Sequence, residues 1–362
     1  MIEILHPVRD RIRIEELCVR LRFVDGWESA AADLRELRRF DSVLPDVDVD
    51  GYDHHSRYVV FPWRATMVRL PDEVLFHRLR TSRNRYLITE TEQLRWESAT
   101  IAVAGLSVGA SLLHTCVLTG ARRLRIADPD TLGPTNLNRL TGSVCDLGTP
   151  KAELAMRRTL ETDPYINLEV FAEGVTEETA SAFFGGNGDR TPDIVLEEVD
   201  DLATKVAIRR WAREAGLPVV MVTDDGDNVI VDVERYDLEP GRPLFHGNAG
   251  DIEALDADEL RDPANRVRIA GAIVGEAIGP RTREALREVG RTMPSWPQLG
   301  TAATLAGAVG AVTARRIVCG DELPSGRARL SIDEVLVAVA SDRETCVKRA
   351  EHGQANGCNT SS

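Results

Sequence analysis

The chain has 362 residues, 43% hydrophobic and 28% charged, and its mean hydropathy is −0.19. These values are typical of a globular protein with a packed core, and they exclude a disordered, collagen-like or low-complexity chain. The 44 basic and 58 acidic residues give a net charge of −14, which disfavours nucleic acid as a partner because this field repels a phosphate backbone.

Residues 1–82 are expected to form a small N-terminal accessory region that mixes helices and strands. Helical patterns occupy 12–23 and 28–40, and a strand-like run occupies 58–63. The first residues lack the apolar run of a signal peptide, so we expect a cytoplasmic protein.

Alternating aspartates at 46, 48 and 50 match the first half of a calcium loop. The twelfth position of that loop should be a bidentate Glu and is Arg57 instead. We therefore favour a solvated acidic loop over a fortuitous metal site.

Residues 83–340 are expected to form the main domain. Short Val/Ile/Leu runs near 100–104, 124–127, 168–171, 194–197 and 217–222 alternate with helical segments. Such continuous apolar strands are typical of a parallel sheet covered on both faces. The run at 228–234 should pair with 219–223 as a hairpin across a turn at 224–226, and 331–339 should be a last strand. The fold class is therefore α/β, with a Rossmann-like, mostly parallel sheet extended by an antiparallel portion.

The rest of the chain divides into an insert, an apolar helix and a tail. Residues 238–298 are loop-rich and charged, with a helix expected at 281–289. The apolar run at 299–314 is shorter than a bilayer requires, so it indicates a buried helix and no membrane partner. Residues 341–362 are expected to be a polar tail.

The cysteines are scattered along the chain without a C-x-x-C pair. This spacing favours reduced thiols and indicates neither a disulfide framework nor a structural zinc site. They stand at Cys18, Cys116, Cys145, Cys319, Cys346 and Cys358.

A glycine-containing turn connects the first strand of the main domain to a helix. It carries Gly105, Ser107 and Gly109, and such a strand–turn–helix unit can present backbone N–H groups to a phosphate. With two glycines rather than three, the turn alone fits a structural role or a nucleotide site. Asp128, about twenty residues further on, ends the next strand, where a carboxylate can bind ribose hydroxyls. Together they indicate a nucleotide site.

Four polar residues after this strand favour a triphosphate over a dinucleotide. Asp130, Asn136, Arg139 and Lys151 follow one another there, and Lys151 is one of only three lysines in the chain. An amide, a guanidinium and an ammonium beyond the ribose suit charge that develops at phosphorus. The alternative is that Arg139 and Lys151 are solvated surface charges.

These residues resemble the motif of the E1-like (ThiF/MoeB) adenylyltransferases, D-x-D-x-(V/L)-x-x-x-N-L-x-R-Q followed by G-x-P-K-A. The resemblance covers about residues 83–319 and implies that ATP is the cofactor. It places Asp128 on the ribose and Asn136 and Arg139 on the phosphates. It also places Lys151 on the triphosphate during attack, with Asp130 in the same binding motif.

The resemblance further implies a homodimer and a magnesium ion. Arg85 matches an arginine that reaches into the partner subunit's nucleotide site, and Asp200 matches a magnesium-binding aspartate. A carboxylate at the carboxyl end of a parallel strand also faces the ligand crevice, which favours a hard cation at Asp200. The competing role for Asp200 or Asp201 is the N-cap of the next helix.

The chain departs from the family pattern at Ser107, Leu140 and Asp201, where Gly, Gln and Asn are expected, and it lacks paired zinc motifs. Cys145 could attack an adenylate, although a small loop residue is the simpler interpretation. We expect an ATP–Mg-dependent enzyme that adenylates a carboxylate, which could be the C-terminus of a ubiquitin-like or sulfur-carrier protein, a peptide or a small acid. The alternatives are a catalytically silent nucleotide-binding scaffold and, less favoured, an NAD(P)-dependent oxidoreductase.

Overall fold

The computed structural model describes residues 1–44, 54–186, 190–275 and 278–337. The aspartate pattern at 46–50, the tail at 341–362, and Cys346 and Cys358 lie outside the described residues.

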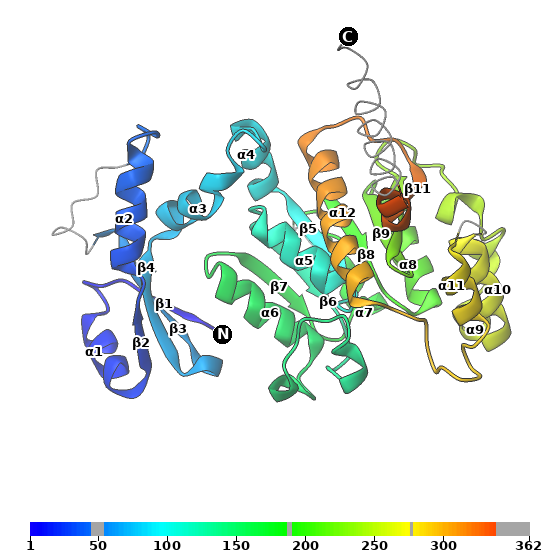
Figure 1. Ribbon diagram of the computed structural model, residues 1–362, viewed down its shortest axis with the longest axis horizontal. Coiled ribbons are helices and arrows are strands. Elements are labelled where there is room, and N and C mark those ends of the chain that lie inside the picture. The colour runs from blue at the N-terminus through cyan, green and yellow to red at the C-terminus, as the bar shows by residue number, and fades with distance from the viewer. Residues whose placement is uncertain (45–53, 187–189, 276–277, 338–362) are drawn as a thin grey trace, which may run out of the picture.

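The N-terminal region is built on a small mixed sheet (Figure 1). Within the described residues its order is β1-β3-β4-β2, with β2 parallel to β4 and the other pairs antiparallel. The strands are β1 (Glu3–Leu5), β2 (Arg22–Asp25), β3 (Ser56–Phe61) and β4 (Thr66–Pro71), and the helices are α1 (Arg11–Arg20), α2 (Trp27–Arg38) and α3 (Glu73–Thr81). The predicted helix at 12–23 ends at Arg20, because Arg22–Asp25 pairs with β4.

The main sheet has the expected parallel body with an antiparallel edge. Over the described residues its order is β11-β10-β9-β8-β5-β6-β7, and the pairs from β9 to β7 are all parallel. The strands are β5 (Thr100–Ala104), β6 (Arg123–Ala127), β7 (Asn167–Phe171), β8 (Ile194–Glu197), β9 (Pro218–Asp225), β10 (Asn228–Arg235) and β11 (Gly326–Leu330). Both β10 pairings are antiparallel, which confirms the predicted fold class.

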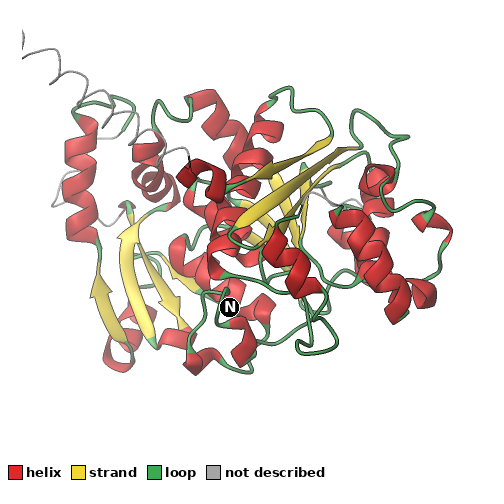
Figure 2. Ribbon diagram, turned by 45° about the vertical axis from the view of Figure 1, so that its right-hand side comes forward, coloured by secondary structure: helices red, strands yellow, loops and turns green. Residues whose placement is uncertain are grey.

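Helices cover both faces of this sheet (Figure 2). Alternate residues of β5 point to opposite faces, so Ile101 and Val103 enter one core and Ala102 and Ala104 the other. The first core contains α4 (Glu90–Ser98), α5 (Gly109–Leu118), α6 (Lys151–Thr162) and α12 (Gly300–Cys319), and the second contains α7 (Glu177–Phe183) and α8 (Leu202–Glu214).

Helix α12 is the buried apolar helix that the sequence predicts. Among the described residues it alone is long and apolar enough to cross a membrane, yet its small residues pack against α5. A Cβ at Gly307 would lie 2.7 Å from the carbonyl oxygen of Ser111, so glycine permits this close approach. This contact is typical of a core helix.

Hydrogen bonds and an ion pair connect the N-terminal region to α6 and to the residues that follow it. Trp63 and Arg64 both donate to the carboxylate of Glu161, and the hydroxyl of Tyr165 donates to the carbonyl of Pro71 at 2.6 Å. Arg80 lies 3.4 Å from the buried Asp163. These contacts place the region at the β7 side of the main sheet (Figure 1).

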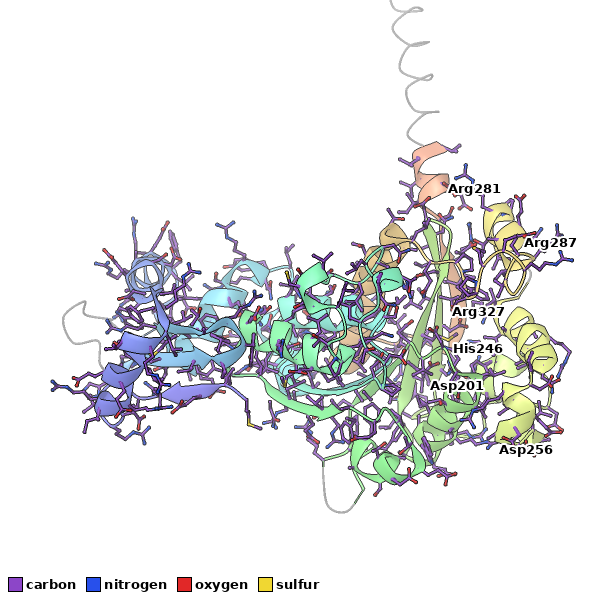
Figure 3. All side chains as sticks on the ribbon, turned by 90° about the horizontal axis from the view of Figure 1, so that it is seen from below. Asp201, His246, Asp256, Arg281, Arg287 and Arg327 are labelled. Atoms are coloured by element: carbon purple, nitrogen blue, oxygen red, sulfur yellow. The ribbon has the colours of Figure 1, made fainter. Side chains whose placement is uncertain are left out.

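The insert lies at the opposite end of the molecule. It contains α9 (Ala257–Arg261), α10 (Pro263–Val274) and α11 (Pro280–Leu286). Figure 3 shows its labelled residues Asp256, Arg281 and Arg287 in the half of the molecule away from the N-terminal region, together with His246 and Arg327.

Two local predictions are wrong. Asp224 and Asp225 are not turn residues: both belong to β9, and Asp225 pairs with Asn228 across a turn at Gly226 and Asp227. The described part of the predicted strand 331–339 is not a strand: β11 ends at Leu330, residues 332–337 are helical, and residues 338 and 339 lie outside the described residues. The hydroxyl of Ser331 accepts the backbone N–H of Glu334 at 3.2 Å and so starts a helix, because a capping serine competes with strand pairing.

Candidate nucleotide site

The turn after β5 requires glycine at its first position. Gly105 has φ +87°, and a Cβ there would lie 2.4 Å from the carbonyl oxygen of Glu198 on the neighbouring strand end. Helix α5 begins at Gly109 after Val108, whose apolar side chain cannot accept a hydrogen bond. The N–H of Ser111 donates to the carbonyl of Val108 at 2.9 Å. Among the described residues, the N–H groups of Gly109 and Ala110 are therefore the ones left to face an anion at this turn.

Asp128 fixes the glycine turn to the end of β6. Its Oδ2 accepts the backbone N–H of Leu106 at 2.6 Å, and its Oδ1 accepts the N–H of Asp130 at 2.8 Å. Burial raises the pKa of this carboxyl, against the charge of Lys151 and the two backbone hydrogen bonds. A residue predicted to bind ribose thus also shapes the loop around that position.

Lys151 begins α6 and lies beside both aspartates. Its Nζ is 2.7 Å from Oδ2 of Asp130 and 3.9 Å from Oδ1 of Asp128, and the residue is only 6% exposed. It is not a solvated surface charge, because its side chain is buried against two carboxylates at the carboxyl end of β6.

Arg139 reaches the glycine turn from the loop after β6. Its Nε donates to Oγ of Ser107 at 2.9 Å, and its Nη1 donates to the carbonyl of Thr135 at 3.0 Å. Burial lowers the pKa of this guanidinium, and the charges of Asp200 and Asp224 oppose that shift. Arg139 is therefore a half-buried cation shared by the turn and two carboxylates.

Asn136 has a local role in the same loop. Its Oδ1 accepts the backbone N–H of Gly133 at 2.8 Å, which holds the short turn that carries Arg139. The predicted phosphate role of this amide stays a prediction.

The two aspartates after β8 have separate positions. Asp201 is the N-cap of α8, because its Oδ2 accepts the N–H of Thr204 at 2.9 Å. Asp200 is exposed and within electrostatic reach of Arg139. Its carboxylate is a hard oxygen donor that fits a magnesium ion. Across the described residues there is no group of three or more His, Cys, Asp or Glu side chains arranged to hold a metal.

A buried network of ion pairs holds the last residue of β8 in place. Glu197 is fully buried and bonds Lys205 at 2.9 Å and Arg209 at 2.5 Å, and Arg209 also bonds Glu234 at 2.6 Å. Burial opposes ionisation of Glu197, but the two cations outweigh it and lower its pKa. The loop that carries Asp200 therefore starts from a fixed point.

Sequence reasoning missed two carboxyl groups at this edge of the sheet. Oε1 of Glu198 accepts the N–H of Val222 at 2.8 Å, and burial raises its pKa well above the usual range. Burial, together with the charge of Asp200, also raises the pKa of Asp224 to about 7, against Arg139. The Asp-Asp-Gly pattern resembles a turn, so only the strand register could have placed Asp224 here.

Arg85 and Cys145 stand apart from these contacts. Arg85 lies 3.8 Å from Asp41 and stacks on Tyr86, and both partners belong to the part of the chain before the main sheet. Cys145 is exposed in the loop between Arg139 and Lys151. The predicted reach of Arg85 into a second subunit stays a prediction.

The chain belongs to the ThiF family, whose model matches residues 81–338. Over 330 residues it is 36% identical to uncharacterized protein MT1398 of Mycobacterium tuberculosis, covering 91% of this chain and 44% of that one. It is also 24% identical to the sulfur carrier protein adenylyltransferase of Thermus thermophilus, over 64% of this chain and 85% of that one. The chain thus spans less than half the length of its mycobacterial relative.

The fold also matches a solved structure. The crystal structure of E. coli MccB with MccA-N7isoASN has a TM-score of 0.50 and 14% identity, over 73% of this chain and 72% of that one. At this identity the likeness shows a shared fold.

Proposed function

We propose that the protein is an ATP- and magnesium-dependent adenylyltransferase that activates a carboxylate. The observation that carries the proposal is the placement of Arg139 on Ser107 and of Lys151 beside Asp128 and Asp130, at the carboxyl ends of parallel strands. Membership of the ThiF family and similarity to a sulfur carrier protein adenylyltransferase support it.

The reaction is a displacement at the α-phosphorus. A substrate carboxylate oxygen bonds to that phosphorus while the bond to the bridging oxygen breaks, and pyrophosphate leaves with the electron pair. The carboxylate is already ionised at neutral pH, so the protein needs to position the reactants and neutralise charge rather than remove a proton. Arg139 and Lys151 supply the positive charges on this chain.

Asp200 is the residue proposed to hold magnesium. When bound with ATP, the ion would neutralise phosphate charge and orient the leaving group. An exposed carboxylate is suited to this role, because magnesium usually keeps several waters and takes further oxygens from phosphates.

The substrate is proposed to be the C-terminus of a ubiquitin-like or sulfur-carrier protein, a peptide or a small acid. The named activity of the Thermus relative fits a carrier protein, and the ligand named for MccB fits a peptide. All of these substrates present a carboxylate.

ATP–pyrophosphate exchange tests the proposal. Exchange that requires magnesium and a carboxylate, and that falls about 100-fold or more in Arg139→Ala, is the expected result. Arg316→Ala is a matched control, because Arg316 is exposed and pairs with Asp321 near the end of α12 rather than with the residues of the candidate site. ATP binding without exchange on any carboxylate would instead indicate a silent scaffold, and preferential NAD(P) binding would indicate an oxidoreductase.

We also propose that the protein acts as a homodimer in which Arg85 reaches the partner's site. Arg85 is 43% exposed at its side chain, and the adjoining Tyr86 and Leu87 are 90% and 84% exposed. Tyr86 also has φ +70°, an uncommon conformation for a large side chain. These features suit a segment that contacts a second copy.

Mixing two inactive variants tests this arrangement. Arg85→Ala and Arg139→Ala should each lose exchange, and mixed dimers should recover part of it because one of their two sites is intact. Failure to recover activity after verified subunit exchange would contradict a shared site.

A further inference from the structure

Two adjacent aspartates at the end of β9 have opposite environments. Asp225 is fully engaged: its Oδ1 accepts the N–H of Gly279 at 2.7 Å, and its Oδ2 accepts Nε of Arg329 at 2.8 Å. Asp224 is 4% exposed, and no donor in the described part of the chain lies within hydrogen-bond distance of either of its carboxylate oxygens. Within the described residues, a carboxylate without hydrogen-bond donors therefore stands next to one whose two oxygens both accept hydrogen bonds.

The strand register directs Asp224 toward the side of the sheet on which the glycine turn and Arg139 lie. Val220 and Val222 face the core that contains α5 and α12, and side chains two residues apart share a face of a strand. Asp224 therefore points to the side on which the glycine turn opens into α5. Asp225 points to the opposite side, toward the insert and β11.

The charged groups around Asp224, counted with its own carboxylate, carry a net negative charge. Arg139 is the cation that interacts with it, and this guanidinium is also shared with Asp200 and hydrogen-bonded to Ser107. A buried carboxylate without hydrogen-bond donors is costly, because its solvation has been lost without replacement. A ligand that brings N–H donors and positive charge would remove that cost.

We propose that Asp224 binds a protonated amino group of the substrate, so that the carboxylate activated here belongs to an amino acid with a free ammonium group. The inference rests on the proposed function and names its substrate class. The carboxylate of the amino acid would lie toward Arg139 and the α-phosphate, and its ammonium would lie toward Asp224.

An ammonium group fits this position better than a second metal ion. Magnesium requires about six oxygen ligands and retains water, whereas Asp224 is almost closed to solvent. An ammonium group has three N–H donors, and it needs only a few acceptors rather than a complete shell of oxygen ligands. Asp200, which is exposed, remains the residue suited to the metal.

Equilibrium binding tests the inference without relying on turnover. The common amino acids would be titrated calorimetrically into the full chain with magnesium and a non-hydrolysable ATP analogue. Each acid that binds would be compared with its deaminated and N-acetylated forms. We expect the free amino acid to bind about 10–100-fold more tightly than either analogue, and Asp224→Asn to bring this ratio close to one.

Asp225→Asn is the matched control, since it makes the same chemical change on the opposite face of β9 and should leave the ratio unchanged in the folded protein. Absence of any amine-dependent binding by the wild type would overturn the inference. Preference for the N-acetyl form would overturn it in favour of a peptide C-terminus. A loss of manganese affinity in Asp224→Asn, measured by electron paramagnetic resonance, would overturn it in favour of a metal ligand.

The two proposals can fail separately. Amine-dependent binding without ATP–pyrophosphate exchange would contradict adenylation and still support the ammonium site. Exchange that is equally fast with deaminated acids would support adenylation and contradict the ammonium site.

Discussion

Nε of Arg139 donates to Oγ of Ser107 at 2.9 Å, so the loop after β6 is joined to the turn after β5 by a side-chain hydrogen bond. Ser107 stands where the family pattern expects a glycine, which has no side chain to accept this bond. The departure from the motif therefore creates a contact that orients the guanidinium toward the phosphate-facing turn.

We expect Ser107→Ala to lower the rate of ATP–pyrophosphate exchange by about 10-fold or more, because one hydrogen bond to a charged group contributes roughly 1.5–3 kcal/mol. Arg139→Ala should cost about 100-fold or more. The double variant should be no slower than Arg139→Ala alone, since Ser107 acts through Arg139. Additive losses would show that the serine acts on the nucleotide independently of the arginine.

The parallel sheet could be predicted because its strands are continuous apolar runs, and Lys151 and Arg139 could be placed because their motif spacing is distinctive. Asp224 could not be placed, since an Asp-Asp-Gly sequence fits a turn and a strand end equally well. The register of β9 against β10 decides between them, and it depends on long-range pairing. The same applies to Ser331, whose capping role depends on where β11 ends.

The thiol of Cys116 should resist alkylation. Burial raises its pKa to about 12, so the reactive thiolate forms only at strongly alkaline pH. In the folded protein at pH 8, iodoacetamide should modify the exposed Cys18 and Cys145 and leave Cys116 intact, as read by peptide mass spectrometry. Modification of Cys116 at the rate of Cys145 would contradict the packing of α5.

Lys151→Met should destabilise the protein as well as slow adenylation. The substitution leaves Asp128 buried without its neighbouring ammonium, which we expect to lower the free energy of unfolding by about 2 kcal/mol. Urea denaturation without nucleotide measures this cost. Asp128→Asn alone should also destabilise the protein, because the amide nitrogen of Asn cannot accept one of the two backbone N–H groups that Asp128 binds. If Lys151 and Asp128 act as a charge pair, the double variant should lose less stability than the sum of the two single variants. Losses equal to that sum would mean that the lysine stabilises the fold without compensating the charge of Asp128.

Asp224 and Asp225 should give opposite stability changes when each is replaced by Asn. The pKa of Asp224 is raised from 3.8 to about 7, mainly by burial, so the folded state holds its proton more tightly than the unfolded state. Wild-type stability should therefore fall as pH rises from about 4 to 7, by up to about 4 kcal/mol, and Asp224→Asn should remove this loss.

The pKa of Asp225 is shifted in the opposite direction, so its effect on stability has the opposite pH dependence. Burial raises its pKa, but hydrogen bonds from Thr282, Arg329 and Gly279 outweigh burial and lower it below 3.8. Its stabilisation is present above about pH 4 and is lost only as pH falls through the lowered value. Asp225→Asn should therefore destabilise the protein about equally at pH 5 and pH 8, whereas Asp224→Asn should stabilise it more at pH 8. Urea denaturation of the nucleotide-free variants at both values measures this contrast, and a pH-independent effect of Asp224→Asn would show that its carboxyl finds a partner in solution.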